Sequence, residues 1–161
     1  MSLHIRPATT ADARVLAAFR GRMFVDMGHA EESAPEILDA AAAYMERAIP
    51  VREYFAWIAE EVGTPVGSVG ALIVTGPPMV AAPSGQIARL QNVFVTPEYR
   101  GRGIARDMLA AAMAGLKGIG IGHVALVASD AGRPVYERMG FEPIPEMRRS
   151  LADWPPENAE Q

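Results

Sequence analysis

Residues 93–105 read VFVTPEYRGRGIA, and this stretch decides the fold of the chain. An apolar run ends at Val95, a turn containing Pro97 follows, and Gly101 and Gly103 then precede an alanine-rich segment. The pattern predicts a strand, a tight glycine loop and the first turn of a helix. Backbone N–H groups in a first helical turn lack intrahelical acceptors, and glycines let an anion approach them closely. The stretch therefore predicts a binding site for a pyrophosphate group.

Three arginines, Arg100, Arg102 and Arg106, add positive charge to this loop. They are either solvated surface charges or, for at least one of them, a phosphate contact. Two other phosphate-binding loops do not fit, because a P-loop requires Lys-Ser/Thr after the glycines and a dinucleotide loop requires a third glycine.

Residues 100–105 instead match R-x-x-G-x-A, and residues 136–141 read YERMGF, which matches Y-x-x-x-G-F. The two motifs resemble the acyl-CoA loop and a second signature of the GNAT superfamily of N-acetyltransferases, and the resemblance extends over residues 4–150. It implies an α/β fold built on a mixed, mostly antiparallel sheet of about six or seven strands. The central parallel pair would splay apart, with about four helices distributed over both faces.

The resemblance also implies where the coenzyme binds. The pantetheine arm would occupy the gap between the splayed strands and contact strand backbone there, while backbone N–H groups of the glycine loop would hold the pyrophosphate. Asp130 departs from the asparagine that the family often has near this point. The residues assigned to the coenzyme site are Phe94, Val95, Arg100, Gly101, Arg102, Gly103, Ile104, Ala105, Ser129 and Asp130.

Tyr136 is the catalytic candidate, since the matching tyrosine of the family protonates the coenzyme sulfur. The alternative interpretation is a helix tyrosine packed against the core. Arg89 stands where many members carry the glutamate that acts as the base. Arg89 could instead face an acceptor carboxylate. Either a water chain and backbone carbonyls then deprotonate the amine, or a carboxylate from elsewhere does, and Asp26, Glu31 and Glu32 are the candidates near the expected acceptor site.

Periodicity and turn residues predict the remaining elements. We expect a strand at 4–6, helices after Thr10 and at 35–49, a hairpin of strands 54–61 and 66–74, a strand at 86–95, a helix at 103–116, a strand at 123–128, a short helix at 132–139, and one or two strands within 141–150.

The composition favours one soluble domain. The chain has 161 residues, 50% hydrophobic content, a net charge of −4 and no cysteine. We expect a single domain at 1–151, a flexible tail at 152–161 and a cytoplasmic location, because no signal peptide or membrane-length apolar run is present. Three scattered histidines do not form a metal site, and no basic run predicts a nucleic-acid surface.

These observations predict transfer of an acetyl group from acetyl-CoA to the primary amine of a small-molecule acceptor, by direct attack in a ternary complex. We expect no metal, nucleic acid or membrane partner, and a homodimer is an option. The alternative is a non-catalytic acyl-CoA sensor, which the departures at Arg89 and Asp130 leave open.

Overall fold

The computed structural model describes residues 3–151. Within them the chain folds into five strands, four α-helices and two short 3-10 turns. In chain order the elements are β1 (Leu3–Pro7), η1 (Thr10–Asp12), α1 (Ala13–Asp26), α2 (Ser33–Ala48), β2 (Tyr54–Glu61), β3 (Thr64–Thr75), β4 (Gln86–Val95), η2 (Pro97–Tyr99), α3 (Ile104–Gly118), β5 (Val124–Ala125) and α4 (Arg133–Arg138). The predicted tail at 152–161 lies outside the described residues.

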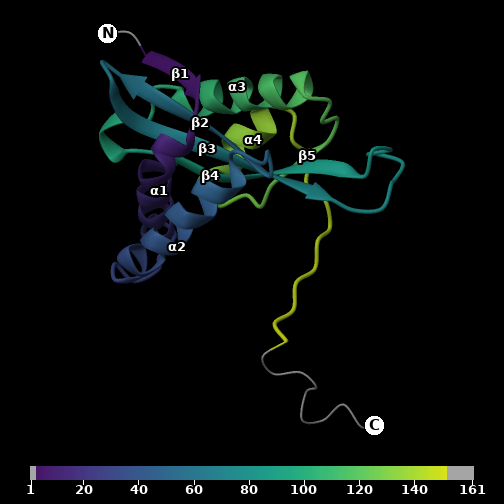
Figure 1. Ribbon diagram of the computed structural model, residues 1–161, viewed down its shortest axis with the longest axis horizontal. Helices are drawn as coiled ribbons and strands as arrows, with labels where there is room; N and C mark the ends of the chain where they lie inside the picture. Colours follow the sequence, from purple (N-terminus) through teal and green to yellow (C-terminus); the bar gives the residue numbers. More distant parts are fainter. Residues whose placement is uncertain (1–2, 152–161) are drawn as a thin grey trace.

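The strands form one sheet in the order β1-β2-β3-β4-β5, and only the β4–β5 pair is parallel. Helices α1 and α2 cover one face, and α3 and α4 cover the other (Figure 1). Each layer has its own buried cluster, with Leu16, Met45 and Ile58 on the α1–α2 side and Met108 and Leu109 on the α3 side. The predicted mixed sheet with helices on both faces is confirmed.

Strand β4 contains a β-bulge that inverts its two faces. Asn92 adopts a positive φ of 55°, and the register with β3 shifts between Ser68 and Gly70. One extra residue in a strand moves every later side chain to the opposite face. Leu90 accordingly packs in the α3-side cluster, whereas the Phe94 ring contacts Phe19 of α1 at 5.3 Å between ring centroids.

The parallel pair separates immediately after it forms. Strand β5 pairs with β4 only at Ala88↔Val124 and Arg89↔Ala125. From Leu90 to Val95, β4 has no strand partner on that side among residues 3–151. The predicted splay is therefore present, and it leaves an open strand edge leading to the glycine loop.

The sheet has fewer strands than predicted, because residues 141–151 contain none. This segment runs away from the body of the domain in an extended form (Figure 1). Pro143 and Pro145 stand at alternate positions and therefore remove the N–H donors along one edge, so the segment cannot form a ladder there. Ile144 and Met147 are exposed and gain nothing from burial in a sheet.

An ion-pair network joins β1, η1 and β2. Arg6 forms two hydrogen bonds with Asp12, at 2.8 and 2.9 Å, and contacts Glu60 at 2.7 Å. The Thr9 N–H donates to the same Asp12 carboxylate at 2.8 Å. The hydrogen bonds from Arg6, aided by that of Thr9, lower the pKa of Asp12 from 3.8 to about 2. The charged carboxylate thus stabilises the folded state.

We expect Asp12→Asn to lower the free energy of unfolding at pH 7 by about 2 kcal/mol. A depressed pKa stabilises the fold at any pH above its unfolded value, and this stabilisation is lost as the pH falls toward the folded value. The difference between wild type and variant should therefore shrink between about pH 4 and pH 2. Urea unfolding followed by circular dichroism measures it. The control is Asp39→Asn, which breaks an exposed pair with Arg14; a pH-independent difference for Asp12→Asn would contradict the assignment.

Candidate functional site

The glycine loop follows β4 as predicted. Gly101 and Gly103 have positive φ values of 75° and 79°, a region that favours glycine. A Cβ placed on Gly101 would meet no atom within 4 Å, and one on Gly103 would approach only the Arg106 guanidinium at 3.7 Å. No atom of the described residues therefore fills the space beside either glycine. The missing side chains allow the positive φ values of the turn and let a ligand reach the backbone.

The backbone N–H groups from Gly101 to Arg106 have the properties of an anion-binding site. None of the six has a hydrogen-bond acceptor within the described part of the chain. The first later donor is the Asp107 N–H, which bonds to the Gly103 carbonyl at 3.1 Å and begins the helical ladder of α3. Six consecutive free donors at a helix N-terminus form a cradle of positive potential.

Each of the three arginines of the loop contacts another group of the protein. Arg100 forms an ion pair with Asp26 at the end of α1, and its Nε donates to the Val95 carbonyl at 2.9 Å. Arg102 donates to the Glu98 carbonyl at 3.1 Å, and Arg106 pairs with Asp107 at 2.8 Å. The backbone N–H groups of residues 101–106 therefore form the row of donors with no partner in the described structure, and the three guanidinium groups, each with N–H groups left over, add positive charge around it.

The two β4 residues predicted to contact pantetheine face different ways. The Thr96 N–H bonds to the Val66 carbonyl of β3, and peptide groups alternate along a strand. The Val95 backbone therefore faces the gap beside β5, whereas the Phe94 backbone faces β3 and its ring packs on α1. The Thr96 hydroxyl, buried at the start of the loop, has no partner among the described residues.

Ser129 and Asp130 lie in the segment between β5 and α4. Ser129 accepts a hydrogen bond from the Gly132 N–H at 3.2 Å, and its carbonyl accepts from the Arg133 N–H at 2.9 Å. Ser129 thus organises the turn into α4. Asp130 is exposed.

Tyr136 is buried on α4, with only 9% of its surface exposed. Its ring lies edge-on to Phe141 at 5.9 Å between centroids and belongs to the α3-side cluster, against which Val95 also packs. Its hydroxyl forms no hydrogen bond with a residue in the range 3–151. Burial raises the pKa of Tyr136, so the phenol stays protonated at neutral pH. The two predicted roles, core residue and proton donor, are compatible here.

A cavity of about 570 Å³ lies on the other face, between helices α1 and α2 and strands β2–β4. We call it the α1–α2 cavity. Its lining is mostly apolar, as is typical of small-molecule sites. The lining residues are Arg20, Phe24, Ile37, Ala40, Ala41, Tyr44, Met45, Tyr54, Leu72, Gln91 and Asn92.

The bulge residue joins this cavity to β4. The Asn92 amide donates to the Tyr54 hydroxyl at 2.5 Å, and its oxygen accepts from Arg20. Burial raises the pKa of Tyr54 to about 12, so its hydroxyl stays neutral. Gly70 makes room for that hydroxyl, because a Cβ there would lie 1.8 Å from it. Sequence reasoning missed Arg20 and Asn92, although asparagine is enriched at positive φ.

Arg89 does not line the α1–α2 cavity. Its Nη2 atom lies 3.4 Å from both carboxylate oxygens of Glu146, which comes from the extended C-terminal segment. The structure therefore brings a carboxylate next to the position where the family glutamate is missing. Of the other carboxylates considered, Asp26 pairs with Arg100, and Glu31 and Glu32 are exposed in the α1–α2 link.

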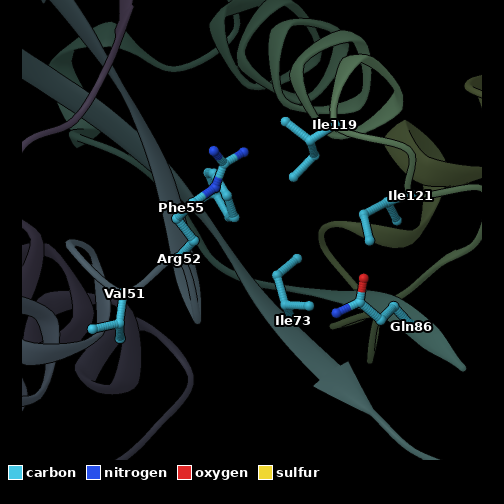
Figure 2. Close-up of a pocket in the computed structure, with 7 residues that line it drawn as sticks. All are labelled: Val51, Arg52, Phe55, Ile73, Gln86, Ile119 and Ile121. Atoms are coloured by element: carbon cyan, nitrogen blue, oxygen red, sulfur yellow. The ribbon is translucent and has the colours of Figure 1, made fainter. Parts of the chain in front are cut away.

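Figure 2 shows a second cavity, of about 230 Å³, with Phe55, Ile73 and Gln86 from three adjacent strands and Ile119 and Ile121 beyond the end of α3. Gln86 begins β4, whereas the glycine loop follows its end. The only charged side chain lining this cavity is Arg52. The α1–α2 cavity, in contrast, includes Gln91 and Asn92 from the half of β4 that leads to the glycine loop.

The residues that the structure describes, 3–151, contain neither a candidate membrane span nor a candidate metal site. None of the helices in that range has the length and apolar character needed to cross a bilayer. No cluster of three or more possible metal ligands occurs in the same range.

A family model described as acetyltransferase (GNAT) domain matches residues 52–143. No curated protein matches the chain significantly.

Solved structures resemble the whole chain. A GCN5-related N-acetyltransferase from Ralstonia eutropha is 28% identical, with a TM-score of 0.86, and the match covers 94% of this chain and 99% of that one. A predicted acetyltransferase from Clostridium acetobutylicum, solved with acetyl-CoA, is also 28% identical with a TM-score of 0.86, over 93% and 97% of the two chains. An aminoglycoside N-acetyltransferase in complex with CoA is 20% identical with a TM-score of 0.70, over 92% and 93%, and shows the shared fold alone.

Proposed function

The chain belongs to the GNAT family of acetyltransferases and is an acyltransferase, and from this premise we propose that it moves an acetyl group from acetyl-CoA to the primary amine of a small molecule. The observation that carries the donor assignment is the run of six free N–H groups from Gly101 to Arg106. A pyrophosphate is the doubly anionic group that such a row of donors suits.

The open edge of β4 supports the same donor. Val95 directs its backbone into the gap beside β5, where an extended pantetheine arm would pair with it like an added strand. Ser129 and Asp130, in the segment that follows β5, would border the gap from the other side. The Val95 carbonyl already accepts a hydrogen bond from Arg100. The pantetheine arm would therefore bond to the Val95 N–H group, or Arg100 would have to move to release the carbonyl.

The chemistry needs few groups. The neutral amine attacks the thioester carbonyl and a C–N bond forms. As the C–S bond breaks, the sulfur takes up one proton, and the nitrogen gives up one proton, through solvent, to the group that protonated the sulfur. We assign the proton that the sulfur takes up to the Tyr136 hydroxyl, which is protonated and has no competing partner in the described structure. The acceptor would enter from the α1–α2 cavity, whose Gln91 and Asn92 belong to the bulged part of β4.

Calorimetric titration with acetyl-CoA and CoA, followed by a free-thiol release assay over a panel of amines, tests the proposal. We expect saturable binding of both ligands and thiol release that depends on the amine. Absence of binding would contradict the donor assignment. Binding without thiol release from any amine would contradict the acceptor assignment and favour the acyl-CoA sensor instead.

A further inference from the structure

The α1–α2 cavity has an uneven charge. Among the residues that line it, Arg20 is positively charged and none carries a carboxylate. Its other polar side chains are neutral: Tyr44, Tyr54, Gln91 and Asn92. A cavity that accepts a polycationic amine would need negative charge, so this lining selects a different kind of acceptor.

Arg20 has donors to spare. Its guanidinium offers five N–H groups. One nitrogen donates to the Asn92 side-chain oxygen, and the guanidinium carbon lies 4.8 Å from the centre of the Phe24 ring. No carboxylate of residues 3–151 forms an ion pair with it. A half-buried cation without a counter-ion bears a desolvation cost that an anionic ligand would offset.

Carboxylates on the helices around the cavity are engaged elsewhere or face solvent. Asp26 of α1 pairs with Arg100 at the glycine loop, and Asp39 of α2 pairs with Arg14 on the surface. Glu36, also on α2, is exposed and absent from the lining. The positive charge of Arg20 is therefore not neutralised from either helix.

The inference rests on the proposed acetyl transfer and names its acceptor class. We propose that the acceptor is an amine bearing both a carboxylate and an apolar body, as an apolar amino acid does, and that Arg20 binds the carboxylate. The apolar body would lie against the aliphatic and aromatic part of the lining, which includes Ile37, Tyr44 and Leu72. Asn92 fixes one edge of the guanidinium and leaves the other free for a charge-assisted pair.

Binding of a product analogue tests the pocket without turnover. We would titrate N-acetyl-L-phenylalanine and its methyl ester into the protein in the presence of CoA. The acid should bind about 10- to 100-fold more tightly than the ester, as expected for a hydrogen-bonded charge pair. Arg20→Met should remove this preference, and Arg20→Lys should restore part of it. Arg14→Met is the matched control, since it removes an exposed charge from the same helix.

Transfer assays separate this inference from the proposed function. Wild type should acetylate L-phenylalanine with a higher kcat/KM than its methyl ester or spermidine, and the Arg20→Met defect should appear mainly in KM. Preferred acetylation of spermidine, or equal binding of acid and ester, would overturn the acceptor class and leave acetyl transfer intact. An acid preference without transfer to any amine would overturn the transfer reaction and leave the binding role of Arg20 intact.

Discussion

Gly103→Trp should weaken acetyl-CoA binding by about 100-fold or more, a loss of nearly 3 kcal/mol of binding free energy. Two effects combine in this variant. A side chain at a φ of 79° strains the backbone of the first turn of α3, and an indole beside the loop would cover the free N–H groups of residues 101–106. Calorimetric titration of acetyl-CoA into the wild type and the variant measures the effect.

The chain offers a matched control at the other end of the same helix. Gly120 has a φ of 90°, and a Cβ there would meet no atom within 4 Å. Gly120→Trp should therefore cost similar backbone strain while acetyl-CoA binds normally. Arg102→Ala should reduce affinity by less than about 10-fold, because backbone donors carry most of the contact. Equal losses in Gly103→Trp and Gly120→Trp would show that the effect is on the fold rather than on the loop.

The glycine loop could be predicted because its signals are local. Gly101 and Gly103 require a backbone conformation that few other residues adopt, and the run from 86 to 95 has strand character along its whole length. The structure has β4 at the same bounds, Gln86–Val95. Local conformational preferences of this kind can be predicted from a single sequence.

Elements that depend on a distant partner were predicted less well. Residues 123–128 have an apolar pattern, yet β5 is only Val124–Ala125, because β4 turns away after two pairs. Residues 141–150 were expected to include strands, but none of them joins the sheet of described strands. Strand formation requires hydrogen-bonding neighbours, which a local pattern cannot reveal.

The acceptor side of the site was the hardest to predict. Arg89 was considered for the acceptor carboxylate, but the structure places Glu146 beside it and Arg20 in the cavity. The bulge at Asn92 inverts the faces of β4, so counting alternate residues from the start of the strand assigns the later side chains to the wrong layer. Arg20 and Asn92 are 72 positions apart, and only the tertiary structure brings them together.

We expect Tyr136→Phe to lower kcat by about 10²- to 10⁴-fold, the usual contribution of a positioned general acid. The change removes one hydroxyl that forms no hydrogen bond with a described residue, so the core packing against Phe141 should be retained. The affinity for acetyl-CoA and the melting temperature should therefore stay close to those of the wild type. Thiol release with the best amine of the panel, together with calorimetry, measures the three quantities.

Tyr99→Phe provides the comparison, because it makes the same chemical change in η2, beside the glycine loop. Its kcat should match the wild type. A normal kcat in Tyr136→Phe would show that Tyr136 is a core residue and that the sulfur takes its proton from elsewhere. A low kcat combined with a lower melting temperature would indicate a packing defect, whereas a low kcat with unchanged stability and unchanged acetyl-CoA affinity assigns the loss to the missing proton. The raised pKa of Tyr136, caused by burial of its side chain, favours the last result, since the hydroxyl keeps its proton until a thiolate forms beside it.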